Sequence, residues 1–200
     1  MKSKRATSPE RILGSSSVVR AANLRRVFGR HDIMGLLVDK GRLERISRGV
    51  YAVVDAPVTE KHGLTVVACR APAGVVALLS ALRFHSLTTQ NPKEIWLAVP
   101  AGGRTPKLDW PPLRVVRMSA PTFELGIETH LVEGVAVRVY SVPKTLVDCF
   151  KFRGRVGLDV ALEALREGWR ARRFTMDELH GFAADCRMTN VMRPYLESLT

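Results

Sequence analysis

Residues 24–51 read LRRVFGRHDIMGLLVDKGRLERISRGVY, and this stretch decides the fold expected for the N-terminal part of the chain. Phe28-Gly29 is placed to form a tight turn, with helical patterns over 18–26 before it and over 30–40 after it. A β-prone segment follows the second helical pattern. This order predicts two short helices and then a hairpin.

The second predicted helix has one apolar face. Ile33, Leu36 and Leu37 recur at i, i+3 and i+4, the spacing that places side chains on one side of a helix. We expect these three side chains to face inward. The outward positions are then Arg30, His31, Met34 and Gly35.

The hairpin is predicted from two short β-prone runs, 43–46 and 50–54, joined by residues 47–49. Gly49 relieves the positive φ that a tight hairpin turn demands. Gly41 suits the left-handed residue that ends the preceding helix. Two helices and an arginine-decorated hairpin in this order are typical of a winged helix-turn-helix, a module that binds duplex DNA.

The distribution of charge agrees with this interpretation. The first 55 residues hold 12 Lys and Arg against 5 Asp and Glu, so they carry seven of the chain's twelve net positive charges. A polyanionic partner is favoured, because each neutralised phosphate releases condensed counterions. A basic surface without such a partner is the alternative that charge alone leaves open.

The candidate DNA-binding residues divide into two groups. In such a module the second helix enters the major groove by its N-terminal residues, so Arg30 and His31 are the expected base readers. The remaining cations are expected on phosphates or in the minor groove, where they set register without much sequence information. They are Arg25, Arg26, Lys40, Arg42, Arg45 and Arg48, with Arg20 as a further member of the set.

The chain is predicted to divide at residues 55–59, where Asp-Ala-Pro-Val-Thr interrupts the pattern. We expect a DNA-binding domain over 1–55 and a larger α/β domain over 60–200. Helical patterns cover 60–70, 74–82, 144–150 and 158–168, a capping box opens a further helix at 175–178, and β-prone runs cover 94–99, 113–117, 127–131 and 135–140. The fold class is therefore α+β, with a small, mostly antiparallel sheet covered by helices.

Motifs for catalysis and cofactor binding are missing. There is no P-loop signature, and the glycines at 102–103 and at 154 and 157 lack the spacing of a dinucleotide-binding fingerprint. The five histidines are scattered, and the sequence holds no carboxylate cluster of the kind that a metal-dependent nuclease or nucleotidyltransferase needs. We therefore expect no catalytic residues, no metal and no cofactor, and an enzyme acting on nucleic acid is only a third hypothesis.

Several conspicuous side chains have a structural interpretation. Asp148 is expected to be a buried carboxylate in an early turn of a predicted helix, where free N–H groups stabilise it. The tryptophans lack regular interleaving with basic residues, so core or domain-interface positions are favoured for Trp96, Trp110 and Trp169. A solvated helix end is favoured over a second anion-binding patch for Arg166, Arg170, Arg172 and Arg173.

The cysteines and the N-terminus indicate the cellular compartment of the protein. Cys69, Cys149 and Cys186 are odd in number and far apart, which indicates reduced, mostly buried thiols. The N-terminus is polar and basic, and no apolar run approaches the ~18 residues needed to span a bilayer. These features predict a cytoplasmic protein without a membrane partner.

Four segments resemble the AbiEi family of antitoxins. Residues 42–51, RLERISRGVY, resemble its "G-x-L-x-R-x-x-R-G-x-Y" wing. Residues 74–88 resemble its buried "SAL…HGLT" helix, residues 95–100 its "V-x-V-P" strand, and residues 144–148, KTLVD, its "R-T-L-V-D" helix start. The likeness covers nearly the whole chain in the right order. Ser86 and Lys144 depart from it, replacing the usual glycine and arginine.

The resemblance implies an antitoxin of a bacterial type IV toxin–antitoxin system. Its winged-helix domain would repress its own operon by binding inverted repeats in the promoter. Its larger domain would counter a co-encoded nucleotidyltransferase toxin without a stable complex. The alternative is a winged-helix transcriptional regulator whose C-terminal domain binds an effector or dimerises, with no toxin partner.

Overall fold

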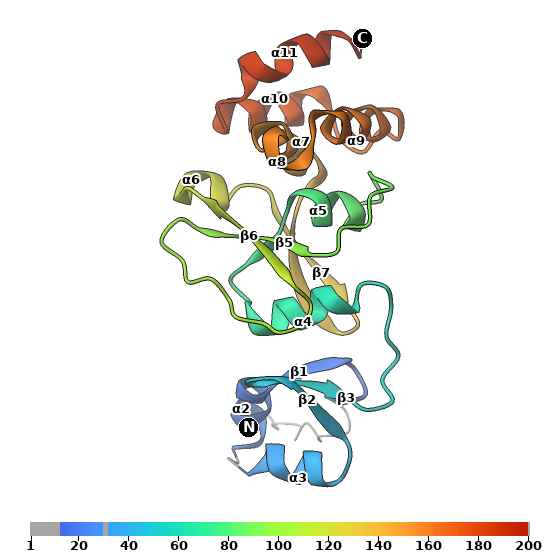
Figure 1. The fold of residues 1–200 in the computed structure, drawn as a ribbon, viewed down its shortest axis with the longest axis vertical. Coiled ribbons are helices and arrows are strands. Elements are labelled where there is room, and N and C mark those ends of the chain that lie inside the picture. Colours follow the sequence, from blue (N-terminus) through green and yellow to red (C-terminus); the bar gives the residue numbers. More distant parts are fainter. Residues whose placement is uncertain (1–12, 30–31, 200) are drawn as a thin grey trace, which may run out of the picture. The chain divides into compact units, whose positions relative to one another are not determined.

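The structure, a computed structural model, describes residues 13–29 and 32–199 (Figure 1). The chain forms two compact units. The N-terminal unit comprises the described part of Met1–Pro72 together with Pro106–Pro111 and His130–Val137, and the C-terminal unit comprises the segments between and after them. The predicted division at residues 55–59 differs from this one, because residues 60–72 and two later segments of the chain pack into the N-terminal unit. The composition of a short segment does not indicate which distant segments will pack together.

The N-terminal unit contains a three-stranded antiparallel sheet in the order β1-β3-β2 (Figure 1). Its elements are β1 (Val18–Arg20), α2 (Ala21–Phe28), α3 (Ile33–Asp39), β2 (Leu43–Ser47), β3 (Val50–Val53) and α4 (His62–Arg70). The helix predicted over 18–26 is therefore wrong at its start. Val18, Val19 and Arg20 are strand, because they pair with Ala52, Tyr51 and Val50 of β3.

Both faces of this sheet are covered. Neighbouring strand residues point to opposite faces, so Val18 and Val19 enter different cores. Val19 packs with Leu24, Ile33 and the other apolar residues of α2 and α3. Val18 packs with Val66 and Cys69 of α4. The sheet is thus a buried layer between α2 and α3 on one face and α4 on the other, which explains its apolar β1.

The apolar face of α3 is rotated from the predicted one. Ile33, Met34 and Leu37 are buried, whereas Leu36 is 38% exposed. Residues 33 and 34 both neighbour residue 37 on a helix, so this trio forms a stripe as compact as the predicted one. The predictions that Met34 faces outward and Leu36 inward are wrong.

The turns follow the predicted glycine chemistry. Gly29 ends α2 at φ +64°, Gly41 follows α3 at φ +63°, and Gly49 turns the β2–β3 hairpin at φ +79°. All three lie in the left-handed region, which costs glycine little. The predicted roles of Phe28-Gly29, Gly41 and Gly49 are confirmed.

The second sheet has five strands in the order β6-β5-β4-β8-β7, and it belongs to the C-terminal unit except for His130–Val137 at the β7–β8 turn. The strands are β4 (Val75–Val76), β5 (Ile95–Pro100), β6 (Leu113–Met118), β7 (Ile127–Val132) and β8 (Val135–Tyr140). β5 runs parallel to β6 and β4 runs parallel to β8, while β4 and β5 are antiparallel. The sheet is mixed, so the prediction of a mostly antiparallel sheet is wrong. The predicted helix over 74–82 is also wrong at its start, which forms the central strand β4.

Helices gather around α7 at one end of this unit (Figure 1). The helices of this unit are α5 (Leu78–Phe84), α6 (Ala120–Phe123), α7 (Val142–Lys151), α8 (Arg153–Val156), α9 (Leu158–Arg170), α10 (Met176–Asp185) and α11 (Thr189–Glu197), of which α6 packs on β5. Every residue from Val142 to Phe150 is buried, because α5, α9, α10 and α11 all pack on α7. The predicted capping box is confirmed, with Thr175 and Glu178 each bonded to the other's backbone N–H. In the described part of the chain, no helix combines the length and apolarity needed to span a bilayer.

Candidate nucleic-acid interface

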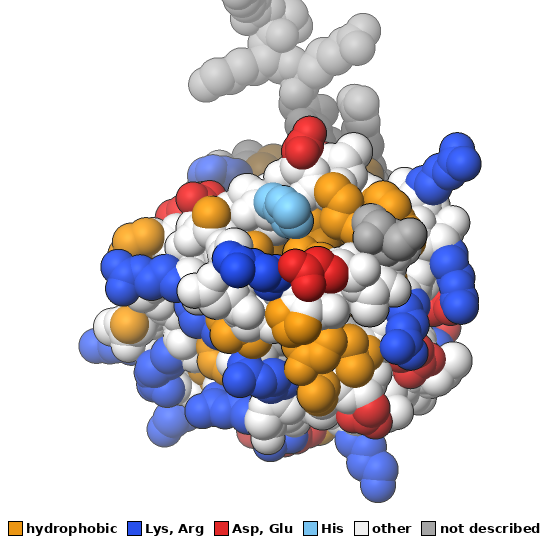
Figure 2. Space-filling view, turned by 90° about the horizontal axis from the view of Figure 1, so that it is seen from above, with side chains coloured by type: hydrophobic (Ala, Val, Ile, Leu, Met, Phe, Trp, Pro, Cys, Tyr) orange, Lys and Arg blue, Asp and Glu red, His pale blue; other side chains and the backbone are white. Residues whose placement is uncertain are grey.

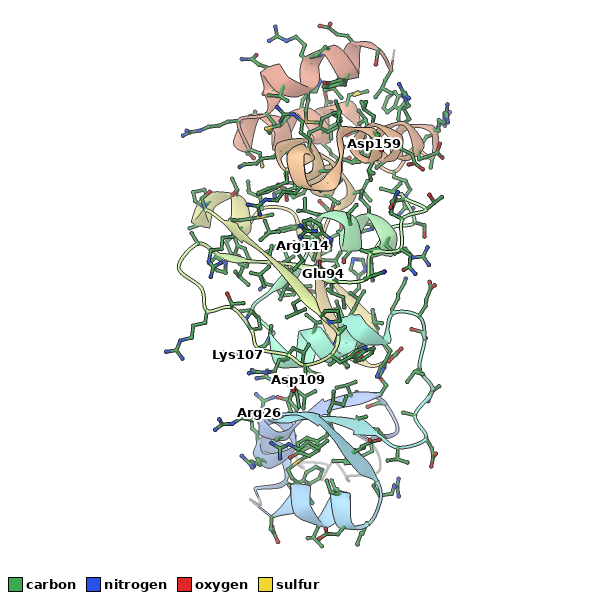
Figure 3. The ribbon with its side chains drawn as sticks, in the orientation of Figure 1. Arg26, Glu94, Lys107, Asp109, Arg114 and Asp159 are labelled. Atoms are coloured by element: carbon green, nitrogen blue, oxygen red, sulfur yellow. The ribbon has the colours of Figure 1, made fainter. Side chains whose placement is uncertain are left out.

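Exposed cations lie on three elements of the N-terminal unit. Arg25 and Arg26 are in the last turn of α2, and Lys40 directly follows α3. Figure 3 labels Arg26 on this unit. Because cations near a helix C-terminus face its partial negative charge, these positions are electrostatically favourable for the fold as well. Arg20, at the end of β1, is only partly exposed.

The hairpin presents the other cations. Arg42 precedes β2, Arg45 lies within it, and Arg48 lies in its turn, and all three are exposed. The ladder shifts register between Arg45 and Ser47, a bulge that increases the local twist. The carbonyl of Gly49 accepts a hydrogen bond of 3.0 Å from the N–H of Ala21, so the hairpin turn is attached to the start of α2.

The predicted base readers Arg30 and His31 lie outside the described residues. What the structure does describe are three exposed residues of α3, Gly35, Leu36 and Val38. Leu36 and Val38 are 38% and 40% exposed. Sequence reasoning missed the exposure of Leu36, because it assigned this residue to the core. The adjacent Ile33-Met34 pair is the signal that could have indicated the correct phase.

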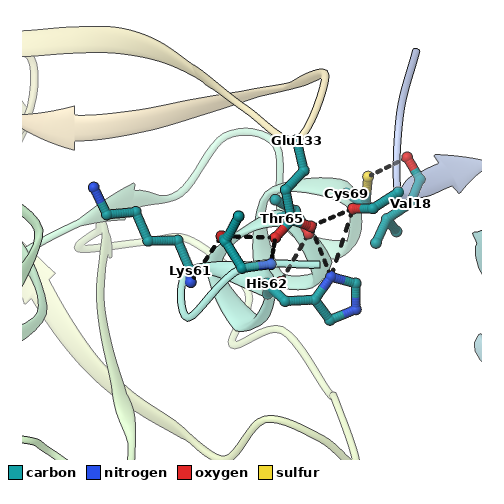
Figure 4. Close-up of polar contacts among 8 residues, drawn as sticks. Val18, Lys61, His62, Thr65, Cys69 and Glu133 are labelled. Atoms are coloured by element: carbon teal, nitrogen blue, oxygen red, sulfur yellow. Dashed lines mark hydrogen bonds and ion pairs between the residues drawn. The ribbon is translucent and has the colours of Figure 1, made fainter. Parts of the chain in front are cut away.

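A polar cluster centred on Glu133 lies within the same unit (Figure 4). The carboxylate accepts hydrogen bonds from the Thr59 backbone N–H at 2.6 Å, the Thr59 hydroxyl at 2.8 Å and the Ser17 hydroxyl. Nδ1 of His62 lies 2.8 Å from its Oε2. The side chain of Glu133 is only 3% exposed. It therefore fastens the β7–β8 turn to β1 and to the start of α4.

This cluster does not have the geometry of a nucleophilic relay. The Ser17 hydroxyl and the Glu133 carboxylate both approach the same ring nitrogen of His62, Nδ1. A relay needs the base to contact nucleophile and acid through its two different nitrogens. Burial raises the pKa of the neighbouring Cys69 thiol to about 11, so this sulfur is held in its protonated, unreactive form. The arrangement is suited to stabilising the unit.

The Glu133 cluster predicts a loss of stability in acid. Burial opposes ionisation of Glu133, but hydrogen bonds from Ser17, His62 and Thr59 outweigh it and lower its pKa from 4.5 to about 2. A carboxylate with a depressed folded-state pKa stabilises the fold above its unfolded pKa, and this stabilisation disappears as pH falls through the folded value. Urea unfolding should therefore show a free energy of unfolding that decreases as the pH falls from 4.5 to about 2. Glu133→Gln should flatten that dependence, and an identical slope in both proteins would contradict the assignment.

The other residues singled out in the sequence are structural or peripheral. Asp148 is buried, as predicted, but its partner is Lys144 Nζ at 2.5 Å and not the start of the helix, because it lies in the seventh position of α7. Trp96 is buried, whereas Trp110 is 52% exposed. The three cysteines are buried and unpaired. Among the described residues, no three His, Cys, Asp or Glu side chains are grouped as a metal site requires.

Comparison with known proteins gives a likeness of fold. No protein-family model matches the chain, and no curated protein matches its sequence. The fold is similar to the crystal structure of the RV2827C protein from Mycobacterium tuberculosis, with a TM-score of 0.56 and 16% identity. The match covers 84% of this chain and 66% of that one, so the chain spans just under two thirds of that protein's length. At this identity the likeness concerns the fold alone.

Proposed function

We propose that the N-terminal unit is a winged helix-turn-helix that binds duplex DNA, and that the chain is a transcriptional autorepressor and antitoxin. The observation that carries the DNA-binding part is the set of exposed cations on α2, after α3 and on the β2–β3 hairpin. These elements occur in the order of a helix-turn-helix followed by a wing. Concentrated positive charge on one module suits a polyphosphate partner.

The proposed binding mode assigns different tasks to α3 and the hairpin. The N-terminal residues of α3 would enter the major groove, where the exposed Leu36 would meet thymine methyl groups. Arg45 and Arg48 would lie against phosphates or in the minor groove. Hydrogen bonding between Gly49 and Ala21 would keep the wing in register with α2.

The antitoxin part of the proposal rests on the resemblance of four segments to the AbiEi family. It requires a nucleotidyltransferase reading frame beside the gene, and rescue of growth when the chain is co-expressed with that enzyme. The alternative is a regulator that responds to a small effector, and an open cavity of about 730 Å³ in the C-terminal unit favours this second candidate. A missing neighbouring toxin gene would favour it over the first.

We expect DNA affinity to depend strongly on salt. If about five phosphates are neutralised, log K should fall with log salt at a slope of about −4 to −5. Fluorescence anisotropy with a promoter duplex measures this slope. Arg48→Ala should weaken binding to all duplexes alike and reduce the slope by about 1, whereas Arg30→Ala should cost about 1–3 kcal/mol of discrimination between operator and random DNA.

A matched control lies in the C-terminal unit, where Arg104 is also exposed. Arg104→Ala should leave both the affinity and the slope unchanged. A DNA affinity of the unmodified protein that does not change with salt concentration would contradict the electrostatic explanation of binding. Equal effects of the Arg30 and Arg48 changes on specificity would mean that base reading and phosphate contact are assigned to the wrong residues.

A further inference from the structure

An open cavity of about 730 Å³ lies between the end of α9 and the start of α10, within the C-terminal unit. Three arginines line it, Arg170, Arg172 and Arg173, together with an apolar wall of Trp169, Phe174 and Met176. Lys and Arg side chains also lie around the rim of the face formed by the C-terminal helices (Figure 2). The cavity has the volume of a small-molecule site, which is commonly about 300–1,000 Å³.

The positive charge of this cavity is only weakly neutralised. Arg170 pairs with Glu167 at 2.9 Å, but both side chains are more than half exposed, and such pairs contribute little. Nη1 of Arg173 donates to the backbone carbonyl of His85 at 3.2 Å, a neutral acceptor. Glu178, which also lines the cavity, is already engaged by Thr175 in the capping box of α10. The arginines therefore retain donors for an anion.

Arg172 occupies a position where the fold favours glycine. Its φ is +51°, and it follows α9 with its N–H bonded to the carbonyl of Trp169. Left-handed residues after a helix are most often glycine, because a Cβ is disfavoured there. Within the described residues, the Arg172 guanidinium makes no hydrogen bond or ion pair with the protein.

The apolar wall is rigidly placed beside these cations. The rings of Trp169 and Phe174 are 6.0 Å apart, and Phe174 is buried against α9. A Cβ at Gly168 would come within 2.9 Å of the Phe174 ring, so α9 and this ring are in close contact. The Trp169 side chain remains partly exposed. A planar apolar group and an anionic group would thus find complementary surfaces in one cavity.

We propose that this cavity binds a nucleotide. Arg170, Arg172 and Arg173 contact the phosphates, because guanidinium groups form charge-assisted, bidentate hydrogen bonds with phosphate oxygens. The base lies against Trp169, since stacking on an indole accepts any base. This site is separate from the proposed DNA-binding surface, and its existence does not depend on that proposal.

The test is isothermal titration of the full chain with ATP, GTP, CTP, adenosine and inorganic pyrophosphate. The nucleotides should bind at submillimolar to millimolar concentration, pyrophosphate at least tenfold more weakly, and adenosine not measurably. Nucleotide binding should quench tryptophan fluorescence, and Trp169→Phe should remove that quenching. Pyrophosphate binding as tight as that of the nucleotides would overturn the role assigned to Trp169.

Arg172→Gly separates binding from folding. Glycine is the favoured residue at this φ, so the melting temperature should be unchanged or higher, while nucleotide affinity should fall at least tenfold. Arg193→Ala is the control, because Arg193 is an exposed arginine of the same unit that does not line the cavity. No nucleotide binding, undiminished affinity in Arg172→Gly, or an equal loss in Arg193→Ala would each overturn the proposal. Binding of duplex DNA but not of nucleotides to this cavity would overturn it as well.

Discussion

Replacing Asp148 with alanine should lower the free energy of unfolding of the C-terminal unit by about 3–5 kcal/mol. Asp148 and Lys144 form a pair of 2.5 Å inside α7, and both side chains are at most 2% exposed. The Lys144 ammonium also lies 4.3 Å from the centre of the Tyr140 ring. Without the carboxylate, this ammonium would be a buried charge with no counterion. Urea unfolding followed by circular dichroism measures the loss.

A double replacement tests the physical reason. Lys144→Met combined with Asp148→Leu removes both charges and keeps the volume of the core, and such exchanges are often neutral or stabilising. We expect the double variant to recover most of the stability that Asp148→Ala loses. A cost below about 1 kcal/mol for Asp148→Ala, or no recovery in the double variant, would show that the pair does not act as a unit.

Replacing Arg45 and Arg48 together with alanine should abolish promoter repression while the protein stays folded. Both side chains are exposed on the β2–β3 hairpin, where substitutions usually change stability by about 0.5 kcal/mol or less. Antitoxicity should survive, because the proposal assigns it to the C-terminal unit. A promoter-reporter assay and a growth-rescue assay on the same variant measure the two activities separately.

The matched control is a double arginine change on the other unit, Arg104→Ala with Arg193→Ala, which should leave repression intact. Loss of both activities in a demonstrably folded hairpin variant would mean that protection works through DNA binding. Retained repression would mean that the hairpin does not contact the operator.

Elements with local causes could be predicted from the sequence. Gly41 and Gly49 adopt the expected left-handed conformations, and the two β-prone runs form the β2–β3 hairpin as predicted. The capping box at Thr175 is also present, because its two hydrogen bonds join residues only three positions apart. In each case the determining interaction lies within a few residues of the chain.

Elements that depend on distant partners were missed. Val18–Arg20 and Val75–Val76 read as parts of helices, but they are strands because Val50–Ala52 and residues of β5 and β8 supply their hydrogen bonds. The sequence could not decide whether Met34 or Leu36 of α3 faces the core, since both fit a helical apolar stripe. In the structure Met34 is the buried one, because it packs with apolar residues of β1 and α2.

The sequence by itself determined the basic N-terminal module, its turns and the set of its candidate DNA contacts. Only the tertiary structure decided which distant groups meet. In the structure Glu133 contacts Ser17 and His62, and Lys144 is buried together with Asp148. Arg172 and Trp169 line the same cavity. The physical reason is that turn and cap preferences act over a few bonds, whereas burial and ion pairing depend on how whole elements pack.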